Sequence, residues 1–294
     1  QPPHRVAAGR VDRPHRVRSE LGFSDEDLAR WRKMTEQPNG IILVTGPTGS
    51  GKTTTLYSTL QHLATPEVNV CTIEDPIEMV EPAFNQMQVQ HGLDLGFADG
   101  VRALMRQDPD IIMIGEIRDL ETAEMAIQAA LTGHLVLSTL HTNDAPSAIT
   151  RLLDLGVAPF MINATLLGVM GQRLVRTLCP HCKKPMPLEA EETAQWNELV
   201  SPWKANPPAQ IHQPEGCLDC RMTGYKGRVG IYEILLMSPA LRKLVTPTTD
   251  IAPLREQASK EGMKPLRISG ALKVANGLTT LEEVVKVAPP ASQP

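Results

Sequence analysis

The sequence is poor in aromatic side chains, and it contains no long apolar run. Phe, Trp and Tyr make up 3% of the 294 residues, so a core must be built from Leu, Ile, Val, Ala and Met. No apolar stretch approaches the roughly 20 residues that a membrane-spanning helix requires. The first 20 residues are rich in arginine and lack the apolar centre of a signal peptide. We therefore expect a cytoplasmic protein that reaches a membrane only through its partners.

A surplus of positive charge is also missing. The chain has 29 Lys and Arg against 33 Asp and Glu, which gives a formal net charge of −4. Non-specific nucleic-acid binders usually carry a basic surplus, because contacts with phosphates supply most of their affinity. The charge balance therefore predicts no nucleic-acid partner and disfavours a nucleic-acid translocase.

Short apolar runs alternate with amphipathic segments in the first half of the chain. Such alternation is typical of an α/β protein whose parallel sheet is covered on both faces. Strands are expected at residues 41–45, 68–73, 111–114 and 135–139, and helices at 25–34, 52–63, 97–106, 120–131 and 145–155. Residues 86–90 fit a possible hairpin, and the chain beyond residue 230 is expected to be helical.

A phosphate-binding loop follows the first expected strand. The segment Gly46–Thr53 fits the pattern G-x-x-x-x-G-K-[ST], in which glycines let backbone N–H groups point at phosphate oxygens. Lys52 would reach the β- and γ-phosphates, and the hydroxyl of Thr53 would coordinate Mg²⁺. The following helix turns its positive end toward the same charge. The predicted nucleotide-binding residues are Gly46, Thr48, Gly49, Ser50, Gly51, Lys52, Thr53 and Thr54.

Acidic side chains follow two other expected strands. Glu74, Asp75 and Glu78 come after the second strand, and Glu116 follows the third. The carboxyl ends of parallel strands lie at one edge of a sheet, so these acids are candidates to hold Mg²⁺ and to orient an attacking water. Some of them could instead be solvated loop acids.

Two histidines flank the fourth expected strand. His134 precedes it and His141 follows it. A histidine beside a strand is more often a satisfied core residue, but this pair could also sense the nucleotide state. Both interpretations stay open.

Four of the five cysteines form two C-x-x-C pairs. Each pair lets two thiolates hold one ion, and two pairs complete the tetrahedron of a structural zinc site. The predicted zinc ligands are Cys179, Cys182, Cys217 and Cys220. The proline-rich segment between the pairs is expected to depend on this metal for its fold. Cys71, in an expected strand, is interpreted as a small core residue.

These segments together resemble the secretion ATPase superfamily, in particular the type II secretion ATPases and the type IV pilus-assembly ATPases. The resemblance covers about residues 22–287 and rests on four motifs in the order of the family. They are the Walker A loop Gly46–Thr53, the aspartate box Thr72–Glu78, the Walker B segment Arg106–Asp119 and the histidine box Gly133–Asp144.

The resemblance implies a RecA-like P-loop core with bound ATP and Mg²⁺, a homo-hexameric ring, and ATP hydrolysis that powers assembly of a type II secretion pseudopilus. By the same resemblance Glu78 activates water, Glu116 lies near Mg²⁺, and His134 and His141 couple nucleotide state to conformation. The general base could be Glu78 or Glu116, and we prefer Glu78. Lys52 completes the expected catalytic set. The cysteine module favours filament assembly over retraction.

The implied partners are an inner-membrane platform, cytoplasmic domains of the same machine and, indirectly, pilin-like subunits. The alternatives are a type IV pilus assembly ATPase and a regulatory subunit that binds ATP with little turnover. Members of the family have N-terminal domains that supply arginines to the nucleotide site, so we expect weak ATPase activity and poor ring formation from this chain alone.

The expected division of the chain has five parts. They are an N-terminal remnant or linker with a helix (1–36), a RecA-like ATPase core (37–176), a zinc-binding module (177–230), a C-terminal helical subdomain (231–287) and a tail (288–294).

Overall fold

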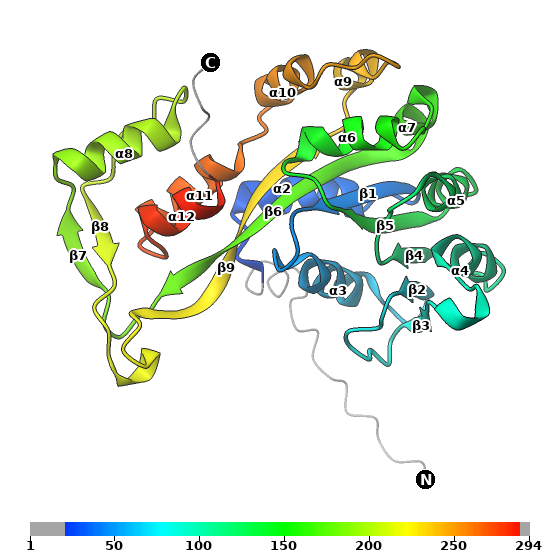
Figure 1. Cartoon of the computed structure of the whole chain (residues 1–294), viewed down its shortest axis with the longest axis horizontal. Helices are drawn as coiled ribbons and strands as arrows, with labels where there is room; N and C mark the ends of the chain where they lie inside the picture. Colours follow the sequence, from blue (N-terminus) through cyan, green and yellow to red (C-terminus); the bar gives the residue numbers. More distant parts are fainter. Residues whose placement is uncertain (1–20, 289–294) are drawn as a thin grey trace, which may run out of the picture.

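The computed structural model describes residues 21–288, and a seven-stranded sheet runs through its centre (Figure 1). Neighbouring strands are parallel except β9, which pairs antiparallel with β6. In spatial order the strands are β3 (Asn85–Gln88), β2 (Val70–Glu74), β4 (Ile111–Ile114), β5 (Leu135–Leu140), β1 (Gly40–Thr45), β6 (Leu166–Leu178) and β9 (Tyr225–Leu236). The expected α/β class is confirmed.

Both faces of the sheet are covered, because successive residues of each strand point to opposite sides. Ile42 and Val44 of β1 pack in a cluster with α2 and α3, whereas Ile41 and Leu43 pack in the cluster that includes α4 to α7. These helices are α2 (Asp25–Thr35), α3 (Lys52–Leu63), α4 (Phe97–Leu104), α5 (Leu120–Leu131), α6 (Ala145–Asp154) and α7 (Pro159–Thr165). Because both faces of the sheet are buried, the sequences of the central strands are continuous apolar runs.

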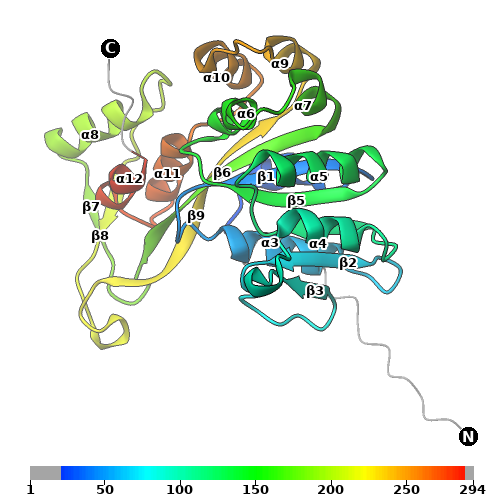
Figure 2. The ribbon, with the colours of Figure 1, turned by 45° about the vertical axis from the view of Figure 1, so that its right-hand side comes forward.

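The C-terminal helices extend this arrangement on two sides. The short helices α9 (Pro239–Leu244) and α10 (Ile251–Lys260) join the cluster of α4 to α7 through Leu241 and Leu254. The helices α11 (Leu266–Ala275) and α12 (Leu281–Val287) gather with α8 (Ala190–Val200) beyond β6 and β9, on the opposite side of the molecule from α4 and α5 (Figures 1 and 2).

The segment between the cysteine pairs is more ordered than its prolines suggest. It forms the helix α8 (Ala190–Val200) and a two-stranded antiparallel sheet of β7 (Lys184–Pro187) and β8 (Gln210–Gln213). Trp196 and Leu199 of α8 are buried in a third cluster with residues of α11, α12 and the strands β6 and β9. This segment therefore has an apolar core in addition to its cysteines.

Two expectations about strands are wrong. Residues 86–90 form no hairpin, because Asn85–Gln88 pairs in parallel with β2 as the edge strand β3. The chain does not turn helical directly after residue 230, since Tyr225–Leu236 is one continuous strand; the expected helices follow from Pro239. Ile231, Ile234 and Leu235 are buried there beside β6. The expected boundary at residue 230 thus falls inside β9.

The expected helices at residues 25–34, 52–63, 97–106, 120–131 and 145–155 are confirmed to within two residues at each end. None of the helices in residues 21–288 is both long enough and apolar enough to cross a membrane. The expected tail (288–294) and the first 20 residues lie almost entirely outside the described part of the chain.

The tight packing of β6 gives a first prediction. A Cβ added at Gly168 would lie 2.4 Å from the carbonyl oxygen of Leu235 and 2.4 Å from the sulfur of Met34. We expect Gly168→Ala to lower the free energy of unfolding by about 1–3 kcal/mol, because the carbonyl of Leu235 belongs to the backbone of β9 and the side chain of Met34 is buried. Urea unfolding measures the change.

Gly92 is the matched control, since a Cβ there would meet nothing within 4 Å. Gly92→Ala should leave the stability within about 0.5 kcal/mol of the parent or raise it slightly. Equal stability of the two variants would show that β6 is not packed as described.

Candidate functional site

The loop between β1 and α3 is bent tightly against β6. A Cβ at Gly46 would lie 2.6 Å from the backbone carbonyl oxygen of Gln172. A Cβ at Gly51 would lie 2.8 Å from the side-chain Nε2 of Gln172. Gly51 also has a φ of +87°, which disfavours any other residue. The side chain of Gln172 is itself fixed, because its Oε1 accepts a hydrogen bond of 2.7 Å from Thr55. The glycines of the motif are therefore required by the fold as well as by phosphate binding.

Lys52 lies at the first turn of α3 and folds back over the loop. Its Nζ donates to the carbonyl oxygens of Gly46 at 2.7 Å and Pro47 at 2.9 Å. Burial lowers the pKa of Lys52 and the nearby Arg173 lowers it further, whereas Glu116 and Glu78 act in the opposite direction. The ammonium group is thus held between the loop and two carboxylates that lie across a cavity.

This cavity has a volume of about 530 Å³ and opens at the carboxyl edge of the sheet. One side is formed by the loop, and the other by the ends of β2, β4 and β5. The predicted residues that line it are Thr48, Gly49, Gly51, Lys52, Thr53, Thr54, Glu74, Asp75, Glu78, Glu116 and His141. Gly46 and Ser50 of the loop do not line it. A cavity with cationic and amide donors on one side and carboxylates on the other can take a triphosphate with its metal ion.

Glu116 follows β4 after Gly115, and its backbone is fixed from β5. Thr139 donates its hydroxyl hydrogen to the carbonyl oxygen of Gly115 at 2.7 Å. One carboxylate oxygen of Glu116 contacts Arg118, while the other lies 3.4 Å from Nε2 of His141. This second oxygen is inaccessible to solvent and accepts no hydrogen bond within residues 21–288. An orphaned buried acceptor in a cavity that Thr53 also lines fits a Mg²⁺ site.

The three acids after β2 have different surroundings. Glu74 is buried and accepts hydrogen bonds from Tyr57 at 2.6 Å and from Thr72 at 2.7 Å. Asp75 pairs with His91 at 3.0 Å. Glu78 is exposed to the cavity, and its side chain has no hydrogen bond or ion pair to any described residue. Only Glu78 of the three is free to contact a water molecule or a ligand.

The two histidines lie at opposite ends of β5. His141 follows the carboxyl end and faces Glu116. His134 precedes the amino end, about 20 Å away for a strand of six residues. Its Nδ1 lies 2.9 Å from the carbonyl oxygen of Ala129 at the end of α5. The structure therefore does not bring His134 to this cavity, and its contacts are those of a helix-capping residue.

Sequence reasoning missed the contribution of β6 to the site. Arg173 is buried beside the loop, where its Nη1 and Nη2 donate to the carbonyl oxygens of Gln172 and Asn143 at 2.9 Å and 2.5 Å. Burial lowers the pKa of Arg173. Through these hydrogen bonds Arg173 links β6, which packs against the P-loop, to the segment after β5. The sequence feature that could have indicated this contribution is the pair Gln172 and Arg173, two buried polar residues within an otherwise mostly apolar strand.

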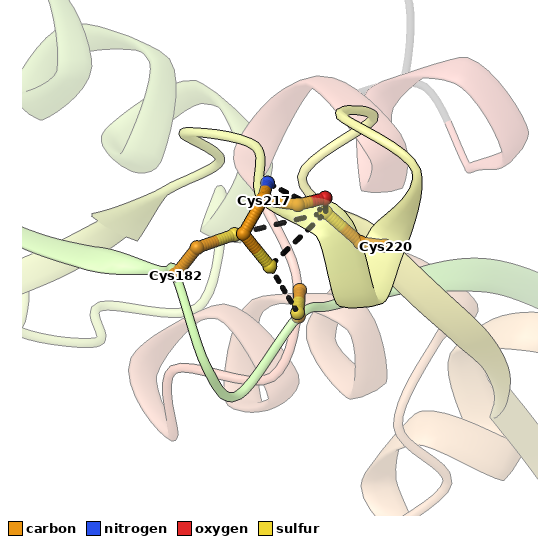
Figure 3. Close-up of side chains that lie close together, drawn as sticks. Cys182, Cys217 and Cys220 are labelled. Carbon is orange, nitrogen blue, oxygen red and sulfur yellow. Dashed lines mark hydrogen bonds between the residues drawn. The ribbon is translucent and has the colours of Figure 1, made fainter.

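The four predicted zinc ligands come together at the ends of β6 and β9 (Figure 3). Their sulfur atoms all lie within 4.8 Å of one another, and the shortest separations are 3.7–3.8 Å. Four sulfurs placed about 2.3 Å from one zinc ion at tetrahedral corners are about 3.8 Å apart, whereas a disulfide requires about 2.05 Å. The geometry fits a four-coordinate zinc ion.

Backbone amides also favour the thiolate form in this cluster. The amides of Cys217 and Gly224 each donate to the sulfur of Cys220 at 3.2 Å. Burial acts to raise the pKa of Cys220, but these hydrogen bonds and those with Cys217 and Cys182 outweigh it and lower the pKa to about 6. Before an ion binds, the opposite holds for Cys182, because burial raises its pKa to about 11. A thiolate is the form that binds a metal ion. His181 adds no ligand to the cluster.

Comparison with known proteins agrees with this site. Residues 10–286 match the family described as type II/IV secretion system protein. The chain is 62% identical to the type IV pilus assembly ATPase TfpB of Acinetobacter baylyi, over 92% of this chain and 46% of that protein. It is 48% identical to the type II secretion system ATPase E of Vibrio cholerae, over 91% of this chain and 52% of that protein.

A solved structure extends the comparison to the fold. The pilus retraction motor PilT with bound ADP superposes with a TM-score of 0.67 at 31% identity, covering 93% of this chain and 67% of that chain. This similarity agrees with the expected RecA-like core. The chain spans about half the length of the curated relatives it matches. From the match over residues 10–286 and these identities, we conclude that the chain belongs to the type II/IV secretion system protein family.

Proposed function

We propose that this chain is the motor part of an ATPase that powers assembly of a filament of pilin-like subunits. The observation that carries the proposal is the cavity itself. Lys52 and the P-loop amides lie on one side of it, and two carboxylates without a full set of hydrogen bonds, Glu78 and Glu116, lie on the other. The relatives named as ATPases support hydrolysis of ATP.

Each residue of the cavity has a role in this proposal. Lys52 and the loop amides bind the β- and γ-phosphates. Glu116 and Thr53 would hold the Mg²⁺, which would supply positive charge to the phosphates. Glu78 accepts a proton from the attacking water, since its carboxylate is free and faces the cavity. His141 contacts Glu116 and can register whether the γ-phosphate and metal are present.

Two kinds of filament fit the comparisons. Relatives named for type II secretion are about as similar as several named for type IV pilus assembly, and both remain in the proposal. The identity of 62% to TfpB favours a type IV pilus over a pseudopilus. The cysteine cluster supports filament assembly rather than retraction. The proposed setting is a cytoplasmic hexamer bound to an inner-membrane platform.

The role of Glu78 gives a second prediction. We expect Glu78→Gln to lower kcat for ATP at least about 100-fold, because proton transfer to a positioned base contributes that much, and to leave the Kd for ATP nearly unchanged. Phosphate release and binding of a fluorescent ATP analogue measure the two quantities.

Glu67→Gln is the matched control, because Glu67 is an exposed acid beyond the amino end of β2. It should behave as the parent does. Binding of ATP without measurable phosphate release in the parent would instead favour a regulatory ATP-binding subunit.

The cysteine cluster gives a third prediction. We propose that it holds one structural zinc ion per chain, and that Cys217→Ser loses this zinc and lowers the melting temperature by several degrees. Metal analysis and thermal unfolding measure both effects. Cys71→Ser, which changes a buried cysteine outside the cluster, should keep the zinc. A purified parent protein without zinc would contradict the proposal.

A further inference from the structure

The segment that carries Glu78 has no helix or strand of its own. It connects β2 to β3, and the residues after Glu78 are open to solvent, with Met79 46% and Val80 86% exposed. A general base must be held close to its productive position, because a displacement of about 1 Å can cost about 100-fold in rate. Contacts from outside the segment must therefore fix it.

The edge strand β3 supplies two of these contacts. Gln86 and Gln88 are two residues apart, so their side chains point to the same side of the strand. Oε1 of Gln88 accepts from the amide of Ile77 at 3.1 Å, and Nε2 of Gln86 donates to the carbonyl oxygen of Met79 at 2.8 Å. The two glutamines thus hold the backbone on either side of Glu78. Oε1 of Gln86 also accepts from the amide of Glu81 at 2.8 Å.

Tyr57 supplies the third contact, from the helix that begins at the P-loop. Its hydroxyl donates its one proton to Oε1 of Glu74 at 2.6 Å and accepts from Nε2 of Gln86 at 2.9 Å. Tyr57 thereby orients the glutamine that donates to the carbonyl oxygen of Met79, which lies 3.0 Å from the same hydroxyl. Burial and the hydrogen bond to Glu74 raise the pKa of Tyr57, so the hydroxyl keeps its proton and remains a donor. Tyr57 lies one helical turn beyond Thr53, which ties the segment to the nucleotide-binding loop.

Glu74 explains why this cluster stays in place. The side chain is 4% exposed, and the hydroxyl of Thr72 donates to its second oxygen. It has no cationic partner among the described residues, so the hydrogen bonds must stabilise it in full. Because both carboxylate oxygens of Glu74 accept hydrogen bonds, its side chain is fixed in place and orients the hydroxyl of Tyr57.

We propose that Tyr57, Gln86 and Gln88 are positioning residues that hold Glu78 at the edge of the nucleotide cavity. This inference rests on the proposed role of Glu78 as the base. None of the three side chains needs to touch the nucleotide. They act through the backbone of Ile77 and Met79.

The test separates kcat from KM. Tyr57→Phe, Gln86→Ala and Gln88→Ala should each lower kcat for ATP about 5- to 10-fold, the value of one lost hydrogen bond, while KM changes less than about twofold. In a Glu78→Gln background, Tyr57→Phe should lower kcat no further, because the residue it positions is already gone.

Two matched variants control for general destabilisation. Tyr232→Phe removes another buried tyrosine hydroxyl, which donates to the carbonyl oxygen of Leu21, away from the cavity. Gln90→Ala changes an exposed glutamine two residues beyond the end of β3, whose side chain makes no hydrogen bond to a described residue. Both should keep the kcat of the parent. A loss of kcat in Tyr232→Phe equal to that in Tyr57→Phe, or the same loss from Tyr57→Phe in the Glu78→Gln background, would overturn the proposal.

Hydrogen exchange tests the same contacts without any turnover. The amides of residues 77–81 should exchange several times faster in Tyr57→Phe and Gln86→Ala, with no change in β1. Unchanged exchange there would overturn the positioning role. A further outcome is that Glu78→Gln leaves turnover intact while exchange rises in Tyr57→Phe and Gln86→Ala. In that case the proposed base is wrong, but the contacts that hold the segment are correct.

Discussion

The hydrogen-bonded pairing of β6 with β1 on one side and with β9 on the other is the constraint on which most of this structure depends. The parallel pairing with β1 places Gln172 and Arg173 directly against the P-loop. The antiparallel pairing with β9 brings the two cysteine pairs together at the ends of both strands. The same two strands bear the cluster of α8, α11 and α12. A sheet strand thus connects the nucleotide cavity to the cysteine cluster without an intervening linker.

The acidic residues of the site differ in their hydrogen-bond partners, and these partners matter more than position along the chain. Glu74 and Glu78 are four residues apart in one motif, yet one is buried and satisfied while the other is exposed and open. Glu116 is intermediate, because one of its oxygens is paired and the other is not. A carboxylate that is already bonded has little to offer a metal ion or a water molecule. The local partners therefore determine which acids can take part in chemistry.

Much of the core and of the site could be predicted from the sequence, because the signals are local. The strands β1, β2, β4 and β5 are apolar runs, and the P-loop and cysteine pairs have fixed spacing. The pairing of β3 could not be predicted, since three polar residues and one methionine at a sheet edge carry no apolar pattern. The distance of His134 from the cavity follows from which end of β5 it occupies, and motif matching ignores that. The role of β6 depends on its neighbour β1, more than 100 residues earlier in the chain.

The composition of β3 has a consequence for the behaviour of the protein in solution. An unpaired sheet edge presents free amides and carbonyls that can pair with another chain. β3 is short, and its sequence Asn-Gln-Met-Gln offers little apolar surface for such a partner. Its glutamine side chains are also engaged by the backbone of residues 77–81. The strand that ends the sheet therefore also protects it against edge-to-edge aggregation.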